Sequence, residues 1–245
     1  SIRLNPECAD AYSNRGAAYN NLGEYDKAIS DFDKAIAIDP NHVSALYNRG
    51  LAKHKKGEFD QALDDYNQAI LLHPGYVSAY NNRGLLWIDL GSPENAIEDF
   101  TTAIRLNPVH AGAFANRGRA WISLGEYERA VIALDKAIML NPDNDNWYYG
   151  RGFAWNELGE YDKSIADHNE AIMLNPENDL AHWSRGVTWH NLDEYDKALV
   201  DFNEALRLDP NNACVYQDRA LTWESLGEEE KAAADRKEYE RLISQ

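Results

Sequence analysis

The residues that could carry out chemistry in this chain are scattered along it. Seven histidines and two cysteines occur in 245 residues, but their spacing matches no metal-binding motif, and Cys8 and Cys214 stand near opposite ends. We find no phosphate-binding glycine loop, zinc-protease motif or nucleophile elbow. The acidic run at residues 142–146 lacks the glycine and distal glutamate of a calcium loop, which indicates a turn. We therefore predict no catalytic residue, no metal site and no cofactor.

The polar feature with a constant spacing is an arginine that returns every 34 residues, from Arg15 to Arg219. An aspartate follows sixteen residues after each arginine except Arg117, where Ala133 stands instead. This spacing favours an ion pair in each copy, semi-buried between two helices. For Arg117 we expect a substitute partner, which could be Asp99, a neighbouring acid, water or a ligand carboxylate. The predicted pairs are Arg15–Asp31, Arg49–Asp65, Arg83–Asp99, Arg151–Asp167, Arg185–Asp201 and Arg219–Asp235.

The elements that must position these arginines follow the same period. Seven of the eight prolines lie 34 residues apart, from Pro6 to Pro210, and a strict period of this length signals a helical solenoid. Inside the first copy, apolar and small residues recur at helical spacing on both sides of Gly23. Gly23 supplies a left-handed residue that ends the first helix, and Pro40 ends the second. Each copy is therefore predicted to be a pair of amphipathic helices.

At these residues the chain resembles the tetratricopeptide repeat family, specifically bacterial-style arrays with an Asn-Arg-Gly run. The resemblance rests on Tyr12, Leu22-Gly23, Tyr25, Phe32 and the proline that follows them. The resemblance implies an all-α fold, a right-handed superhelical solenoid of stacked antiparallel helix pairs. Repeats are expected at residues 9–42, 43–76, 77–110, 111–144, 145–178, 179–212 and 213–245. The last is expected to carry a charged capping helix, and residues 1–8 to be the end of a truncated upstream repeat.

The family's first helices line a concave groove, and the resemblance implies that their sixth positions face it. These positions hold Asn14, Asn48, Asn82 and Asn116 in the first four repeats. The row is similar to the asparagine ladder with which O-linked N-acetylglucosamine transferases hold a peptide backbone, since an amide both donates and accepts hydrogen bonds. The alternative is that each asparagine bonds a neighbouring helix. No lysine stands at the fifth positions, which argues against the two-carboxylate clamp of cochaperones.

The groove positions become aromatic in the fifth and sixth repeats. Tyr149 and Phe153 share one helix face, and Trp183 follows in the next repeat with Leu180 nearby. Aromatic side chains beside an arginine, here Arg119, have the composition of an interaction hot spot. We predict that these five residues contact a ligand. The alternative is that they fill a locally distorted groove.

Charge and hydropathy restrict the partners. With 24 basic and 41 acidic residues the net charge is −17, which argues against nucleic acid and anionic membranes as ligands. No apolar stretch is long enough to span a bilayer, so we expect no membrane insertion. The acids concentrate on the second helices, where they keep the convex side soluble. The two unpaired cysteines favour a reducing cytoplasm, although the compartment stays open.

The sequence therefore favours a non-enzymatic scaffold that binds a protein or peptide in a concave groove. The alternative is a regulatory, sensor or self-assembly arm of a larger protein, whose uncapped N-terminal end could self-associate. No set of residues in the sequence supports an enzymatic activity.

Overall fold

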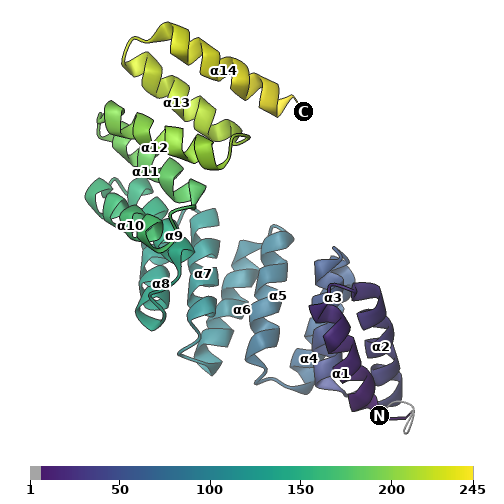
Figure 1. Cartoon of the computed structure of the whole chain (residues 1–245). Coiled ribbons are helices and arrows are strands. Elements are labelled where there is room, and N and C mark those ends of the chain that lie inside the picture. The colour runs from purple at the N-terminus through teal and green to yellow at the C-terminus, as the bar shows by residue number, and fades with distance from the viewer. Residues whose placement is uncertain (1–6, 245) are drawn as a thin grey trace. The chain divides into compact units, whose positions relative to one another are not determined.

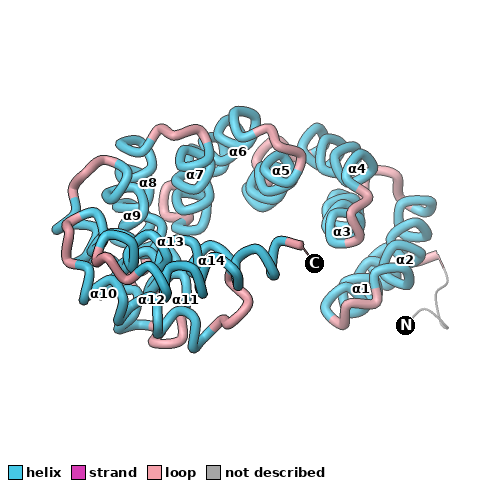
Figure 2. The backbone as a smooth tube through the Cα atoms, turned by 90° about the horizontal axis from the view of Figure 1, so that it is seen from above, coloured by secondary structure: helices cyan, strands magenta, loops and turns pink. Residues whose placement is uncertain are grey.

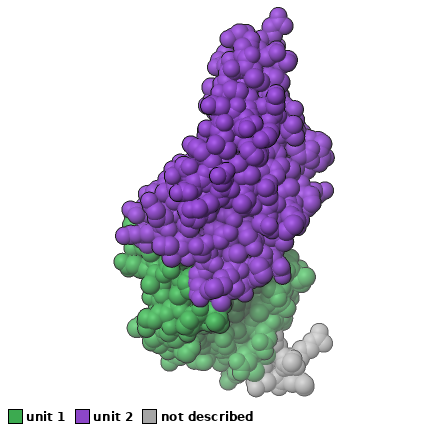
Figure 3. Space-filling view, turned by 90° about the vertical axis from the view of Figure 1, so that its left-hand side faces the viewer, with its two compact units in different colours: residues 1–120 green, residues 121–245 purple. Residues whose placement is uncertain are grey.

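The computed structural model describes residues 7–244, and within them every regular element is an α-helix (Figure 1, Figure 2). The chain divides into two compact units, residues 1–120 and 121–245 (Figure 3). The boundary falls inside one helix, α7 (Ala111–Ser123). Of the predicted upstream remnant at residues 1–8, positions 1–6 lie outside the described residues.

The first unit holds six further helices. They are α1 (Ala9–Asn21), α2 (Tyr25–Ile38), α3 (Val43–Lys55), α4 (Phe59–Leu72), α5 (Val77–Asp89) and α6 (Pro93–Leu106). Neighbours in the chain pack as antiparallel pairs, α1 with α2, α3 with α4 and α5 with α6 (Figure 1). The pairs stack in chain order, since α2 contacts α3 and α4 contacts α5.

The second unit is built in the same way. It contains α8 (Tyr127–Leu140), α9 (Asp145–Glu157), α10 (Tyr161–Leu174), α11 (Asp179–Asn191), α12 (Tyr195–Leu208), α13 (Ala213–Ser225) and α14 (Glu229–Ile243). The pairs are α9 with α10, α11 with α12 and α13 with α14, and α8 packs on α9. The predicted fold class, an all-α solenoid of stacked antiparallel helix pairs, is confirmed.

The core of five helix pairs contains a close approach between a glycine and an aromatic ring. A Cβ atom on Gly84 of α5 would lie 2.5 Å from the Phe100 ring of α6, and one on Gly186 would lie 2.7 Å from Phe202. Both rings are fully buried. Only a residue without a side chain lets the two helices approach this closely. The last pair departs from this pattern, because Ala220 stands in place of the glycine and Arg236 in place of the ring.

Asp193 replaces glycine at one of the turns between paired helices. The glycines at this turn have positive φ, for example 75° at Gly159, and Asp193 adopts φ 59° at the corresponding position. A side chain is strained there, and aspartate tolerates the conformation better than most residues. Its Oδ1 atom also accepts a hydrogen bond of 2.7 Å from the Tyr195 hydroxyl. The turn in the sixth repeat is therefore held at a conformational cost that the other turns avoid.

We expect Asp193→Gly to stabilise the protein by about 0.5–1 kcal/mol, because the strain is relieved while an exposed hydrogen bond is lost. Thermal unfolding followed by circular dichroism measures the change. Gly159→Ala, which introduces a side chain at the corresponding turn, is the matched control and should lower the melting temperature. A melting temperature that falls in Asp193→Gly would show that the tyrosine hydrogen bond outweighs the strain.

Candidate functional site

The repeated arginines form the predicted ion pairs. Arg83 on α5 donates through Nε and Nη2 to both carboxylate oxygens of Asp99 on α6, at 2.8 and 2.6 Å. The aspartate is 4% exposed, so the pair is largely shielded from water. The same two-pronged geometry occurs at Arg15–Asp31, Arg49–Asp65, Arg151–Asp167, Arg185–Asp201 and Arg219–Asp235. The prediction of these six pairs is confirmed, and the arginines are occupied by structural contacts.

Each of these arginines from Arg49 onward also reaches back to the preceding helix pair. The Nη1 atom of Arg83 donates to Asn67 of α4 at 2.6 Å, and that of Arg185 donates to Asn169 of α10 at 2.6 Å. The corresponding partner of Arg49 is Asp33, at 2.7 Å. One guanidinium therefore joins three helices and links consecutive repeats.

Arg117 is the exception that the sequence indicated. Its Nη1 atom makes one long contact of 3.4 Å with Thr101, and the guanidinium lies 5.5 Å from the Phe114 ring centre. Its Nε atom is buried without a hydrogen-bond partner among the described residues. Burial lowers the pKa of Arg117 from its usual value. Asp99, one of the predicted substitutes, is held by Arg83.

The fifth and sixth positions of neighbouring first helices are joined by a second series of hydrogen bonds. Asn82 Nδ2 donates to the Tyr47 hydroxyl at 2.5 Å, and Asn116 Nδ2 donates to Asn81 Oδ1 at 3.1 Å. In the second unit Trp183 Nε1 donates to Asp218 Oδ2 at 2.7 Å. Each bond joins residues 35 positions apart, so it links the fifth position of one repeat to the sixth position of the next.

This geometry changes the interpretation of the asparagine row. Asn82 and Asn116 use their amide nitrogens to hold a neighbouring helix, and Asn48 donates to the Ser44 carbonyl of its own helix at 2.8 Å. Asn14 is exposed on α1. The alternative considered for the row, bonding to a neighbouring helix, therefore describes two of its four members. Their Oδ1 atoms remain as acceptors, and a role in holding a peptide stays a prediction.

The aromatic residues of the second unit are half-buried rather than fully exposed. Tyr149 lies 6.1 Å from His168, centre to centre, and Phe153 meets Tyr127 edge to face at 6.3 Å. Burial raises the pKa of Tyr149, and its hydrogen bond with Ser184 opposes that shift. These side chains contribute to packing as well as to the surface.

The remaining predicted residues lie apart from this packing. Trp183 packs against the core around Phe202, and Leu180 on the same helix is 37% exposed. Arg119 is exposed on α7 and belongs to the first unit. A common site for Arg119 and the aromatic residues of the second unit therefore stays a prediction.

A cavity of about 220 Å³ is lined by residues of α11, α12 and α13. Its lining combines apolar and polar side chains, namely Val187, His190, Asn191, Phe202, Asp218 and Leu221. His190 Nδ1 is hydrogen-bonded to the Thr222 hydroxyl at 2.8 Å. The residues predicted from the sequence to contact a ligand include neither Asp218 nor Leu221. Their groove positions were the available signal.

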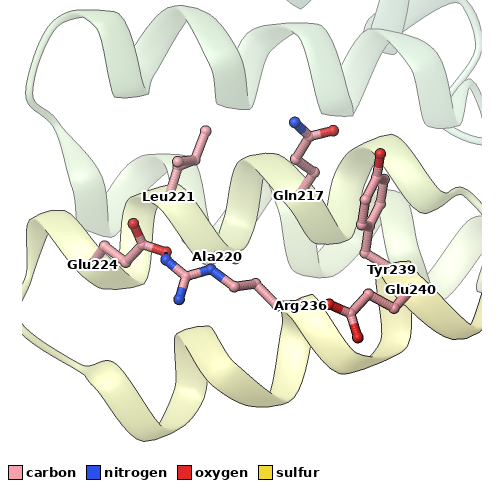
Figure 4. A pocket seen from close by; sticks show the side chains of 7 residues that line it. All are labelled: Gln217, Ala220, Leu221, Glu224, Arg236, Tyr239 and Glu240. Atoms are coloured by element: carbon pink, nitrogen blue, oxygen red, sulfur yellow. The ribbon is translucent and has the colours of Figure 1, made fainter.

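A second cavity, of about 280 Å³, opens between α13 and α14 (Figure 4). The guanidinium of Arg236 points toward Glu224, and the two form an ion pair. Gln217, Leu221 and Tyr239 complete the wall. Arg236 and Glu224 therefore satisfy each other, and the carboxylate of Glu240 also lines this cavity.

Neither a metal centre nor a membrane span emerges from residues 7–244. They contain no group of three histidine, cysteine, aspartate or glutamate side chains that could hold a metal ion. None of their helices is both long and apolar enough to cross a bilayer.

Comparison with known proteins identifies the family. A model described as tetratricopeptide repeat matches residues 9–42, 43–76 and 184–212, and a second model with the same description matches residues 88–145. Together they cover more than half of the chain.

Solved structures of bacterial-type repeat proteins are similar to this one. MamA is 30% identical with a TM-score of 0.62, and the match covers 67% of this chain and 96% of MamA. A tetratricopeptide repeat protein from Parabacteroides merdae ATCC 43184 is 24% identical with a TM-score of 0.76, over 96% and 93% of the two chains. YrrB, described as a TPR protein with an unusual peptide-binding site, is 21% identical with a TM-score of 0.64, over 75% and 95%. The present chain belongs to the tetratricopeptide repeat family.

Proposed function

We infer that this protein is a non-enzymatic scaffold that binds an extended segment of a partner protein along the first helices of its repeats. The supporting observation is the cavity between α11 and α13, which has an apolar lining of Val187, Phe202 and Leu221 and a polar rim. Apolar pockets with a few convergent polar groups are the usual form of a binding site. The family typically mediates protein–protein interactions, which agrees with this role.

The predicted groove residues of each unit give such a segment further contacts. Leu180, Tyr149, Phe153 and Trp183 offer apolar surface in the second unit, and the amide oxygens of Asn48, Asn82 and Asn116 offer acceptors in the first. We propose Asn14 and Arg119 as polar contacts of the same kind. We also propose that the chain belongs to the arrays with an Asn-Arg-Gly run, in which the arginine stabilises the scaffold and leaves recognition to its neighbours.

We expect Leu221→Glu to abolish capture of a partner, because the substitution places a carboxylate in the apolar part of the cavity. Leu221 is 47% exposed, so the variant should fold. Affinity capture from a host lysate, quantified by mass spectrometry, compares this variant with the wild type.

The matched control is Val200→Glu on α12, at a side chain that is 68% exposed and does not line this cavity. A partner lost in Leu221→Glu and retained in Val200→Glu supports the groove. A partner retained in both variants would place the interaction elsewhere on the protein.

A further inference from the structure

Asp218 is a half-buried carboxylate without a cationic partner. Its Oδ2 atom accepts the hydrogen bond from Trp183, and no described residue donates to Oδ1. No lysine or arginine of the described chain forms an ion pair with it. Burial raises the pKa of Asp218, while its hydrogen bond from Trp183 and the nearby His190 oppose the shift.

The other acids in comparable surroundings differ from Asp218 in this respect. Asp99 and Asp201 each face an arginine at 2.6 Å, and Glu224 in the adjacent cavity is paired with Arg236. A carboxylate removed from water is stabilised when a cation completes its hydrogen bonds. Asp218 lies at the wall of a cavity that also has an apolar part, formed by Val187, Phe202 and Leu221, and no cation of the described chain is paired with it.

We propose that the cavity between α11 and α13 receives a lysine side chain from an extended partner segment. The methylene groups would lie on Val187, Leu221 and the Phe202 ring, and the ammonium group would donate to Asp218 Oδ1. This inference rests on the proposed function and adds the chemistry of the residue that is recognised. It also places opposite charges, the Asp218 carboxylate and the lysine ammonium group, at the contact.

Lysine fits the cavity better than arginine because only one carboxylate oxygen is free. Arginine recognises carboxylates through two parallel hydrogen bonds, and the second oxygen of Asp218 is already used by Trp183. An ammonium group needs a single acceptor and carries an apolar stem that suits the cavity lining. A neutral apolar side chain would fill the same space and leave Oδ1 without a donor.

The test uses three fluorescent heptapeptides, Gly-Ala-Ala-X-Ala-Ala-Gly, in which X is lysine, acetyl-lysine or norleucine. Fluorescence anisotropy with the full chain measures their dissociation constants. We expect the lysine peptide to bind at least about tenfold more tightly than the other two, the ratio typical of a charge-assisted hydrogen bond. The advantage should shrink as ionic strength rises.

Asp218→Asn provides the decisive variant. An amide oxygen still accepts from Trp183, and asparagine is the natural residue at this position in the first four repeats, so the variant should fold. It should reduce the preference for lysine to less than about twofold. Glu230→Gln, an equal change of charge in the first turn of α14, should leave the preference unchanged.

Each contrary result overturns the inference in a recognisable way. Equal binding of lysine and norleucine would show an apolar cavity without cation recognition and would leave the scaffold function intact. A lysine preference that survives Asp218→Asn would place the cation elsewhere. Absence of binding by all three peptides would reject lysine recognition here, whereas the Leu221→Glu capture experiment judges the scaffold function separately.

Discussion

Asp99→Ala is expected to destabilise the protein by about 3 kcal/mol, the lower part of the range for breaking a buried ion pair. The substitution leaves the Nε and Nη2 atoms of Arg83 without their acceptors, and Asn67 remains as a hydrogen-bond acceptor for Nη1. Denaturant titrations fitted with a nearest-neighbour model measure the change, because repeat arrays do not always unfold in one step.

The control for this prediction is Asp33→Ala, which removes the more exposed acceptor of Arg49. That contact should contribute less than about 1 kcal/mol. Replacing Arg83 and Asp99 together by leucine should recover most of the lost stability, since no unpaired charge remains. Equal stability of Asp99→Ala and Asp33→Ala would contradict a structural role for the in-repeat pair.

His168→Phe is expected to stabilise the protein, with an effect that grows in acid. His168 is fully buried at the ring position of its helix pair, and neither ring nitrogen has a hydrogen-bond partner among the described residues. Leaving such groups unpaired costs about 1–3 kcal/mol, which phenylalanine avoids at neutral pH. The corresponding pairs hold Phe32, Phe100 and Phe202, so the substitution restores the prevailing residue.

The pH dependence of this effect follows from the titration of the imidazole. Burial, with a contribution from Arg185, lowers the pKa of His168 from 6.5 to about 3, while Asp201 opposes the shift. Between these values the unfolded chain binds the proton and the folded chain does not, so stability contributed by neutral His168 is lost as pH falls below 6.5. The loss is about 1.4 kcal/mol for each pH unit.

The measurement compares the unfolding free energies of wild type and His168→Phe at pH 7.5, 6 and 5, so that other titrations cancel. His168→Asn is a polar control that also lacks the acid effect. A difference between wild type and His168→Phe that stays constant with pH would contradict the buried neutral imidazole.

Much of the fold could be predicted because the same residue types recur at the same spacing in each repeat. The periodic glycines and prolines indicated the helix pairs, and the constant Arg–Asp spacing indicated six ion pairs that the structure contains. The backward contact of each arginine was missed, because its acceptor varies among Asp33, Asn67 and Thr101. Variation of residue type hides a contact even where its position is constant.

The candidate site was harder to predict because its contacts join different repeats. Trp183 and Asp218 stand 35 residues apart, and the same two positions hold tyrosine and asparagine at Tyr47 and Asn82. The residue types alone do not reveal that these positions pair. The solvent exposure of the aromatic residues also depends on how closely the neighbouring helix packs against them. The residue pattern of one helix does not indicate this packing.

The backward contact of the arginines has a consequence for how such an array can change in length. Arg185 bonds Asn169 in the preceding pair, and Arg219 bonds Asn203 in the same way. If recombination removed residues 179–212, the guanidinium of Arg219 would meet Asn169, which offers the same amide oxygen. This contact would survive at the new junction without a compensating mutation, so the arginine link is compatible with gain or loss of repeats in steps of 34 residues.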